Sequence, residues 1–125
     1  MKKMIIIAVI FLALVLSSCD VLNTYNITVR NSCADPTPFP IRVKLTLSSI
    51  APSMLFDSDL LSNGATVSYS DQNYGKHYLH IMDPNASSLS GARYYSCKEL
   101  SITKNDTWII TWDNTTSAYV VNVSY

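Results

Sequence analysis

Short runs in which apolar and polar residues alternate fill the chain after its first twenty residues, and they constrain the fold more than any other feature. Successive side chains of a β-strand point to opposite faces, so such runs predict strands with one buried face and one wet face. We expect seven strands, at residues 25–30, 41–47, 65–70, 78–82, 98–103, 108–112 and 118–124. No helical pattern as long as ten residues appears after residue 19.

The segments between these runs carry turn residues, as in 62–64, 83–85 and 104–106. Residues 34–40 contain three prolines, which lack the backbone donor of a central strand, so a rigid loop is expected there. Residues 50–61 fit either a short amphipathic turn or a loop that crosses the core. The sequence therefore predicts an all-β fold: a small single-domain antiparallel β-sandwich, or a small barrel, over residues 24–125.

The first eighteen residues have the pattern of a cleaved secretion signal. Lys2 and Lys3 precede the uninterrupted apolar run 5–16, and the small residues Ser17 and Ser18 follow it. A helix of this run is about 18 Å long, too short to cross a hydrocarbon core of about 30 Å. We therefore expect residues 1–18 to be removed.

The residues Leu16-Ser17-Ser18-Cys19 resemble the lipobox of bacterial lipoproteins. The resemblance implies that Cys19 carries acyl chains as the new first residue and that residues 19–23 form a very short tether. It also implies an extracytoplasmic protein of the cell envelope, anchored to a membrane by lipid. The alternative is an ordinary secretory signal, cut near Ser17 or Ser18, that leaves Cys19 as a plain thiol.

The remaining cysteines, Cys33 and Cys97, form an even pair in an oxidising compartment. We expect them to form one disulfide, with two free buried thiols as the alternative. Two cysteines alone make a poor zinc site.

Charge excludes a nucleic-acid partner. The chain has nine basic and nine acidic residues, so no broad basic face is available for a phosphate backbone. Loss of Lys2 and Lys3 leaves a net charge of about −2, so membrane residence would depend on the acyl chains rather than on attraction to anionic lipids.

The sequence offers no arrangement for catalysis, and we expect neither an enzyme nor a cofactor or metal site. His77 and His80 stand three apart on an expected strand, so they face opposite sides and cannot bind one metal together. We expect both at the surface or at an edge. No Gly-x-Ser-x-Gly elbow occurs, and Glu99 is the single glutamate, so no acid–base pair is placed.

Aromatic residues indicate both core and partner surface. Trp108 and Trp112 share a strand face with Ile110, which is typical of core. Tyrosines supply rigid amphipathic contacts at binding surfaces, so we expect a partner at the stretch 74–95. Its four tyrosines are Tyr74, Tyr78, Tyr94 and Tyr95.

The loop Ser90-Gly91-Ala92-Arg93-Tyr94, followed by Lys104 in the turn 104–106, resembles the Ser-Gly-x-x-Tyr loop and lysine hairpin of the membrane-bound inhibitors of c-type lysozyme. Those inhibitors are small, disulfide-bonded β lipoproteins. The resemblance implies that Ser90 and Lys104 enter the lysozyme cleft and engage its catalytic carboxylates. A plain hairpin turn is the alternative for Ser90-Gly91.

These observations predict a lipid-anchored, non-catalytic binding or assembly module of the cell envelope with a protein partner. Lysozyme inhibition is the alternative. A further alternative is a secreted glycoprotein of eukaryotic or viral type, because Asn-x-Ser/Thr triplets are glycan acceptors in such proteins. The triplets begin at Asn26, Asn85, Asn105, Asn114 and Asn122.

Overall fold

The computed structural model describes residues 23–55 and 57–124, and this part of the chain contains eight strands and no helix. The strands are β1 Thr24–Asn31, β2 Ile41–Thr46, β3 Asp59–Leu61, β4 Thr66–Asn73, β5 Gly75–Met82, β6 Tyr95–Ile102, β7 Asp106–Asp113 and β8 Ala118–Ser124. The all-β prediction is confirmed, and each of the seven expected strands overlaps an observed one. The additional strand is β3, within the segment that the sequence left open.

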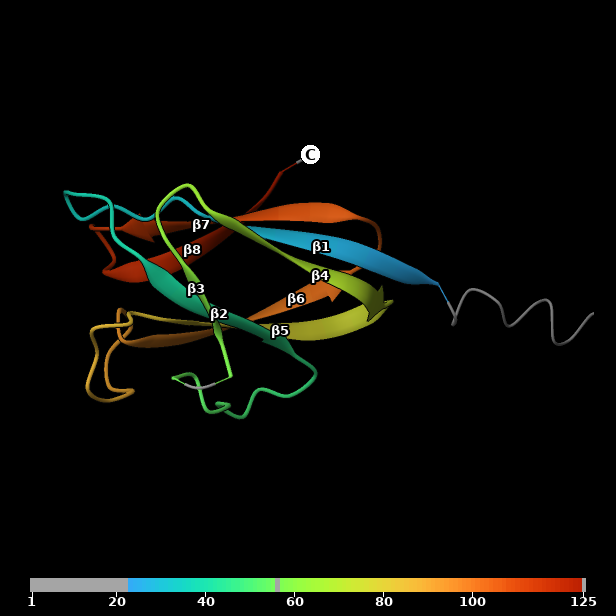
Figure 1. Cartoon of the computed structure of the whole chain (residues 1–125), viewed down its shortest axis with the longest axis horizontal. Coiled ribbons are helices and arrows are strands. Elements are labelled where there is room, and N and C mark those ends of the chain that lie inside the picture. Colours follow the sequence, from blue (N-terminus) through green and yellow to red (C-terminus); the bar gives the residue numbers. More distant parts are fainter. Residues whose placement is uncertain (1–22, 56, 125) are drawn as a thin grey trace, which may run out of the picture.

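Two four-stranded sheets pack face to face (Figure 1). The first sheet has the order β4-β1-β7-β8, and the second has the order β3-β2-β5-β6. The prediction of purely antiparallel pairing is wrong at one place, because β1 and β7 run parallel. The chain passes through the whole second sheet between these two strands, which gives the long connection that parallel neighbours require.

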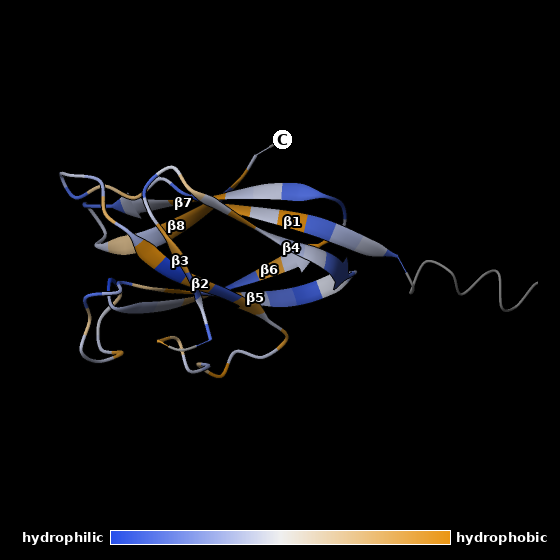
Figure 2. Cartoon of the chain, viewed as in Figure 1, coloured by the Kyte–Doolittle hydropathy of each residue, from blue (hydrophilic) through white to orange (hydrophobic). Residues whose placement is uncertain are grey.

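The space between the sheets is the apolar core. Apolar residues alternate with hydrophilic ones along the strands (Figure 2), and the apolar set faces inward. Each fully buried side chain of this size contributes about 1.5–3 kcal/mol to folding. The buried residues include Ile27, Val29, Ile41, Val43, Leu79, Ile81, Trp108, Ile110 and Tyr119.

Aromatic side chains cover one end of the core. The sequence predicted core positions for Trp108 and Trp112, the two tryptophans of β7. Trp112 packs edge-on against Phe39, with ring centroids 6.4 Å apart, and against Tyr119 at 5.1 Å. These contacts bring the proline-rich segment before β2 onto β7 and β8. The end of the sandwich formed by residues 32–40 and 83–94 is thereby fixed to the core.

The predicted disulfide between Cys33 and Cys97 is wrong, because both are free cysteines. Cys33 lies in the core, where its Sγ donates to the carbonyl of Ile110 at 3.6 Å. Cys97 stands directly across from His80 on the neighbouring strand, and both point to the outer face of the second sheet. The sheet therefore separates the two side chains, whereas a disulfide needs Cβ atoms that face each other across about 4 Å.

The expected signal peptide, the Cys19 lipidation site and the tether up to residue 22 lie outside the described residues. Among residues 23–55 and 57–124, no helix has the length and hydropathy needed to span a membrane.

Candidate binding site

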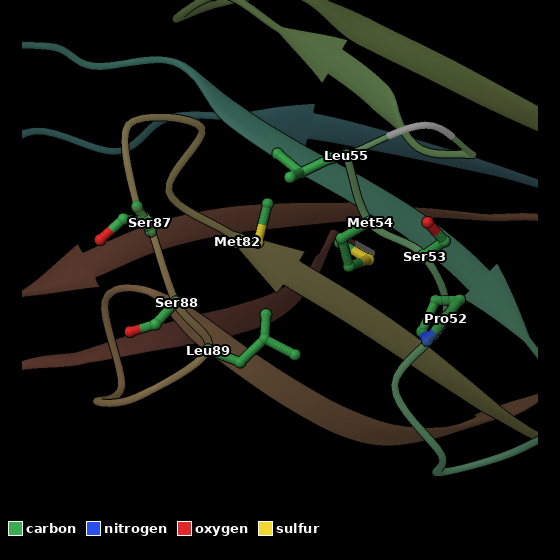
Figure 3. A pocket seen from close by; sticks show the side chains of 9 residues that line it. Pro52, Ser53, Met54, Leu55, Met82, Ser87, Ser88 and Leu89 are labelled. Carbon is green, nitrogen blue, oxygen red and sulfur yellow. The ribbon is translucent and has the colours of Figure 1, made fainter.

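A pocket of about 220 Å³ lies on the outer face of the second sheet, between two loops. Figure 3 shows Met54 and Met82 lying between Leu55 and Leu89. Met54 and Met82 are only 3% and 2% exposed and form the floor, whereas Leu55 and Leu89 are 53% and 48% exposed and form the rim. The other lining residues are Pro52, Ser53, Ala86, Ser87 and Ser88.

The floor of the pocket lies where strand β5 is buried on both faces, near the end of the strand. Ile81 points into the core, so His80 and Met82 on either side of it point outward, yet all three are buried. The loop of residues 47–55 and 57–58 crosses this outer face and covers His80 and Met82. A near-continuous apolar run is the signal of a strand covered on both sides, and the sequence of β5 carries that signal after His77.

His80 holds the crossing loop in place. Its Nε2 lies 2.8 Å from the hydroxyl of Thr46 and 3.0 Å from the carbonyl oxygen of Ser48, and its Nδ1 lies 2.7 Å from the hydroxyl of Tyr95. Burial lowers the pKa of His80 below its usual value of 6.5. The neutral ring fits these partners with Nε2–H donating to the loop and Nδ1 accepting from Tyr95.

The expectation of surface histidines is wrong for both residues. His77 and His80 are buried, on opposite faces of β5 as their spacing predicted. Sequence spacing gives the face to which a side chain points, but it does not show what covers that face. Here the crossing loop covers His80.

Two backbone contacts complete the wall of the crossing loop. The Lys44 Nζ donates to the carbonyl of Asp57 at 2.8 Å, and the hydroxyl of Ser58 donates to the carbonyl of Met54. The first contact ties the end of the loop to β2, and the second closes a turn within the loop. Met54, which it carries, packs onto the sheet as one half of the pocket floor.

Arg93 holds the second loop, residues 83–94, at its base. Its Nη1 donates to Asp35 at 2.9 Å and its Nε donates to Asp83 at 3.0 Å. The guanidinium also lies over the ring of Phe39, with 4.6 Å from Cζ to the ring centroid. The Tyr119 hydroxyl donates to the carbonyl of Arg93 at 2.6 Å. Residues 86–89, which form one wall of the pocket, therefore belong to a loop that Arg93 and Tyr119 hold against the core.

Further large apolar side chains are exposed on the segments around the pocket. Leu47 and Ile50 belong to the crossing loop, and Leu60 lies on β3. Exposed apolar side chains that adjoin a pocket, as Leu55 and Leu89 do, are typical of binding surfaces. The sequence stretch 74–95 contributes only one side of this region, and the crossing loop, which the sequence did not single out, contributes the other.

The residues that the sequence predicted for binding lie in different parts of the structure. Ser90, Gly91 and Tyr94 lie on the same loop as the pocket residue Leu89, and Gly91 has a φ of +86° that suits a turn. Tyr95 and Tyr78 are half-buried on β6 and β5, where Tyr95 supports His80. Tyr74 and Lys104 lie in the turns at the other end of the sandwich (Figure 1).

Ser90 and Lys104 are not brought together. Ser90 precedes β6 and Lys104 follows it, so eight strand residues separate the two loops by about 26 Å. The two side chains therefore do not form the single cleft-binding element that the lysozyme-inhibitor resemblance implies.

The described residues hold no group of three His, Cys, Asp or Glu side chains that could bind a metal ion. Comparison of the sequence with models of known protein families and with curated proteins finds no match. We therefore infer the function from the sequence motifs and from the geometry of the pocket.

Proposed function

We propose that the chain is an extracytoplasmic lipoprotein, acylated at Cys19, whose sandwich domain is a non-catalytic binding module at the cell envelope. The pocket on the outer face of the second sheet takes an apolar group from a protein partner. The lipobox-like residues before Cys19 support the anchor, and the loop-bounded pocket supports the binding role.

The observation that carries the binding role is a methionine floor beneath a leucine rim. Methionine side chains are flexible and polarisable, so they adapt to apolar groups of different shape. Leu55 and Leu89 are exposed to water at the rim. A partner that covered them would therefore gain the free energy of burying both apolar side chains. Three serines on the lining supply hydrogen-bonding groups that orient what binds.

The volume limits what the pocket can take. Pockets for drug-sized ligands hold about 300–1,000 Å³, and this one holds about 220 Å³. One large apolar side chain suits it better than a whole metabolite. A protein partner that inserts a leucine, isoleucine or phenylalanine fits this volume.

The two floor residues provide a direct test. The chain has four methionines, and Met1 and Met4 precede Cys19, so the processed protein retains only Met54 and Met82. Methyl-labelled methionine in the acylated protein, held in lipid nanodiscs, should give two signals, both from the pocket. We expect N-acetyl-leucine methylamide to shift both signals, because the probe carries one leucine side chain and two peptide groups.

Two variants make this test specific. Leu89→Asp places a charge on the pocket rim and should abolish the shifts, whereas Val120→Asp changes an exposed residue of β8 in the other sheet and should leave them unchanged. Absence of any shift in the unaltered protein, or equal shifts in both variants, would refute the pocket as the binding site.

The anchor has its own test. Cys19→Ala should move the protein from the membrane fraction to the soluble fraction, because it removes the thiol that would carry the acyl chains. Cys97→Ala is the matched control, and it should stay with the membrane. Membrane retention of Cys19→Ala would contradict the lipoprotein assignment.

A further inference from the structure

We propose that the end of the sandwich at which β1 begins rests on the lipid surface, with Tyr74 placed among the lipid headgroups. This inference depends on the proposed acylation of Cys19 and goes beyond it, because an anchor alone does not fix which side of a domain meets the membrane. The partner that contacts this end of the sandwich is the interfacial region of the lipid bilayer.

The tether leaves little freedom. Thr24, the first residue of β1, follows Cys19 by five residues, so their Cα atoms lie at most about 17 Å apart. The eight-residue strands make the sandwich longer than this, at about 26 Å. The start of β1 must therefore lie near the membrane, while the far end can lie well away from it.

Tyr74 lies beside the start of β1. Thr24 pairs with Asn73, the last residue of β4, and Tyr74 is the single residue that joins β4 to β5. This connection carries the chain from the first sheet to the second across the end of the sandwich (Figure 1). Gly75 has a φ of +117°, which allows the corner and leaves the Tyr74 side chain 60% exposed at the tip.

A tyrosine at this place suits the interface better than water. Its ring is apolar and its hydroxyl is polar, so tyrosine is enriched where lipid headgroups meet the hydrocarbon. The pairing Thr24↔Asn73 places Tyr74 next to the one point of the domain that the tether holds near the lipid. Contact with the headgroups then adds to the hold of the acyl chains.

The charges at this end do not favour anionic lipid. Lys104 is exposed in the β6–β7 turn, but Asp106 follows it and the exposed Asp71 lies on β4. Lys76 is paired with Glu99 at 3.1 Å. Because both signs are present, we expect the contact to depend on the tether and the aromatic ring, with little response to the anionic lipid content.

The competing arrangement is a domain that lies on its side. Tyr94 makes a matched reporter for it, because it is 45% exposed and lies at the other end of the second sheet. Tyr94 precedes β6, whose first residue pairs with Met82 at the end of β5, whereas Tyr74 precedes the start of β5. An end-on domain brings only Tyr74 to the lipid, and a side-on domain brings both tyrosines near it.

The experiment compares Tyr74→Trp with Tyr94→Trp in the acylated full-length product, reconstituted in phosphatidylcholine vesicles. Lipids brominated near the headgroup end of the acyl chain quench nearby tryptophan, and the unaltered protein gives the background from Trp108 and Trp112. We expect quenching of the added fluorescence in Tyr74→Trp, none in Tyr94→Trp, and the same result with one part in five of phosphatidylglycerol. Quenching in both variants, in neither, or in Tyr94→Trp alone would overturn the proposed orientation.

An intact mass from each vesicle sample separates this inference from the proposed function. An acylated chain with an unquenched Tyr74→Trp variant overturns the orientation and leaves the lipoprotein assignment in place. A chain without acyl groups overturns the lipoprotein assignment, and the orientation with it.

Discussion

His80 couples the stability of the fold to pH through a single buried ring. Burial lowers its pKa in the folded state below 6.5, so the unfolded chain takes up a proton more readily as the pH falls. The contribution is therefore fully present above about pH 6.5 and decreases as the pH falls from there towards the folded pKa. We expect a lower urea midpoint at about pH 5.5 than at about pH 7.5.

The variant His80→Gln should remove this part of the pH dependence, because it has no group that titrates in this range. It should also lower the midpoint at both pH values through the lost contacts to Ser48 and Tyr95. His77→Gln is the control, since it leaves His80 and its partners in place. A His80→Gln variant with an unchanged pH slope would show that other groups carry the effect.

Arg93 is a second residue with a measurable role. Arg93→Met keeps an apolar stem over Phe39 but leaves Asp83, which is only 7% exposed, without its cation. We expect the free energy of unfolding to fall by about 2 kcal/mol in urea denaturation, because a largely buried carboxylate loses its partner. Lys76→Met breaks the exposed pair with Glu99 and should leave the stability nearly unchanged. Equal losses in the two variants would contradict the clamp.

Single residues show where sequence reasoning succeeds and where it fails. The inner positions of Trp108 and Trp112 were predictable, because period-two spacing fixes the face of a strand. The separation of Cys33 from Cys97 was not predictable, since an even number of cysteines says nothing about which side of a sheet each occupies. Burial of His80 was missed because a distant loop provides the cover.

The same contrast between local pattern and distant contact applies to whole strands. Long alternating strands such as β2, β7 and β8 were found because each repeats its pattern over several residues. Strand β3 has three residues, too few to show a period, and it forms through pairing with β2. The parallel pairing of β1 with β7 was also out of reach, because a local pattern specifies a strand but not its neighbour.

The corner between β4 and β5 gives a prediction at this scale. Gly75 has a φ of +117°, and a residue with a Cβ atom is strained there although no atom lies within 4 Å of that position. We expect Gly75→Ala to lower the free energy of unfolding by about 1–2 kcal/mol in urea denaturation. Asn73→Ala, two residues earlier and without positive φ, should cost less. Equal stability of Gly75→Ala and the unaltered protein would mean that the corner tolerates another conformation.

At the scale of the whole molecule, the end of the sandwich that lies near the membrane determines which loops are accessible to a partner. The pocket joins Met54 of the crossing loop to Met82 and Leu89, which lie at least 28 residues further along the chain, and these side chains meet only when the two loops fold over the second sheet. Its residues could not have been grouped from the sequence for this reason. The proposed tether would join the opposite end, where β1 begins, so an anchored domain would offer its loops 32–40 and 83–94 away from the membrane (Figure 1).

The intact mass of the mature chain, extracted with detergent, shows directly whether the protein is anchored by lipid. We expect a chain that begins at Cys19 and carries the added mass of acyl groups. Alkylation under denaturing conditions should add two groups, on Cys33 and Cys97, with no reductant needed. A chain without lipid that carries a ladder of hexose masses would refute the lipid anchor and would support a secreted glycoprotein.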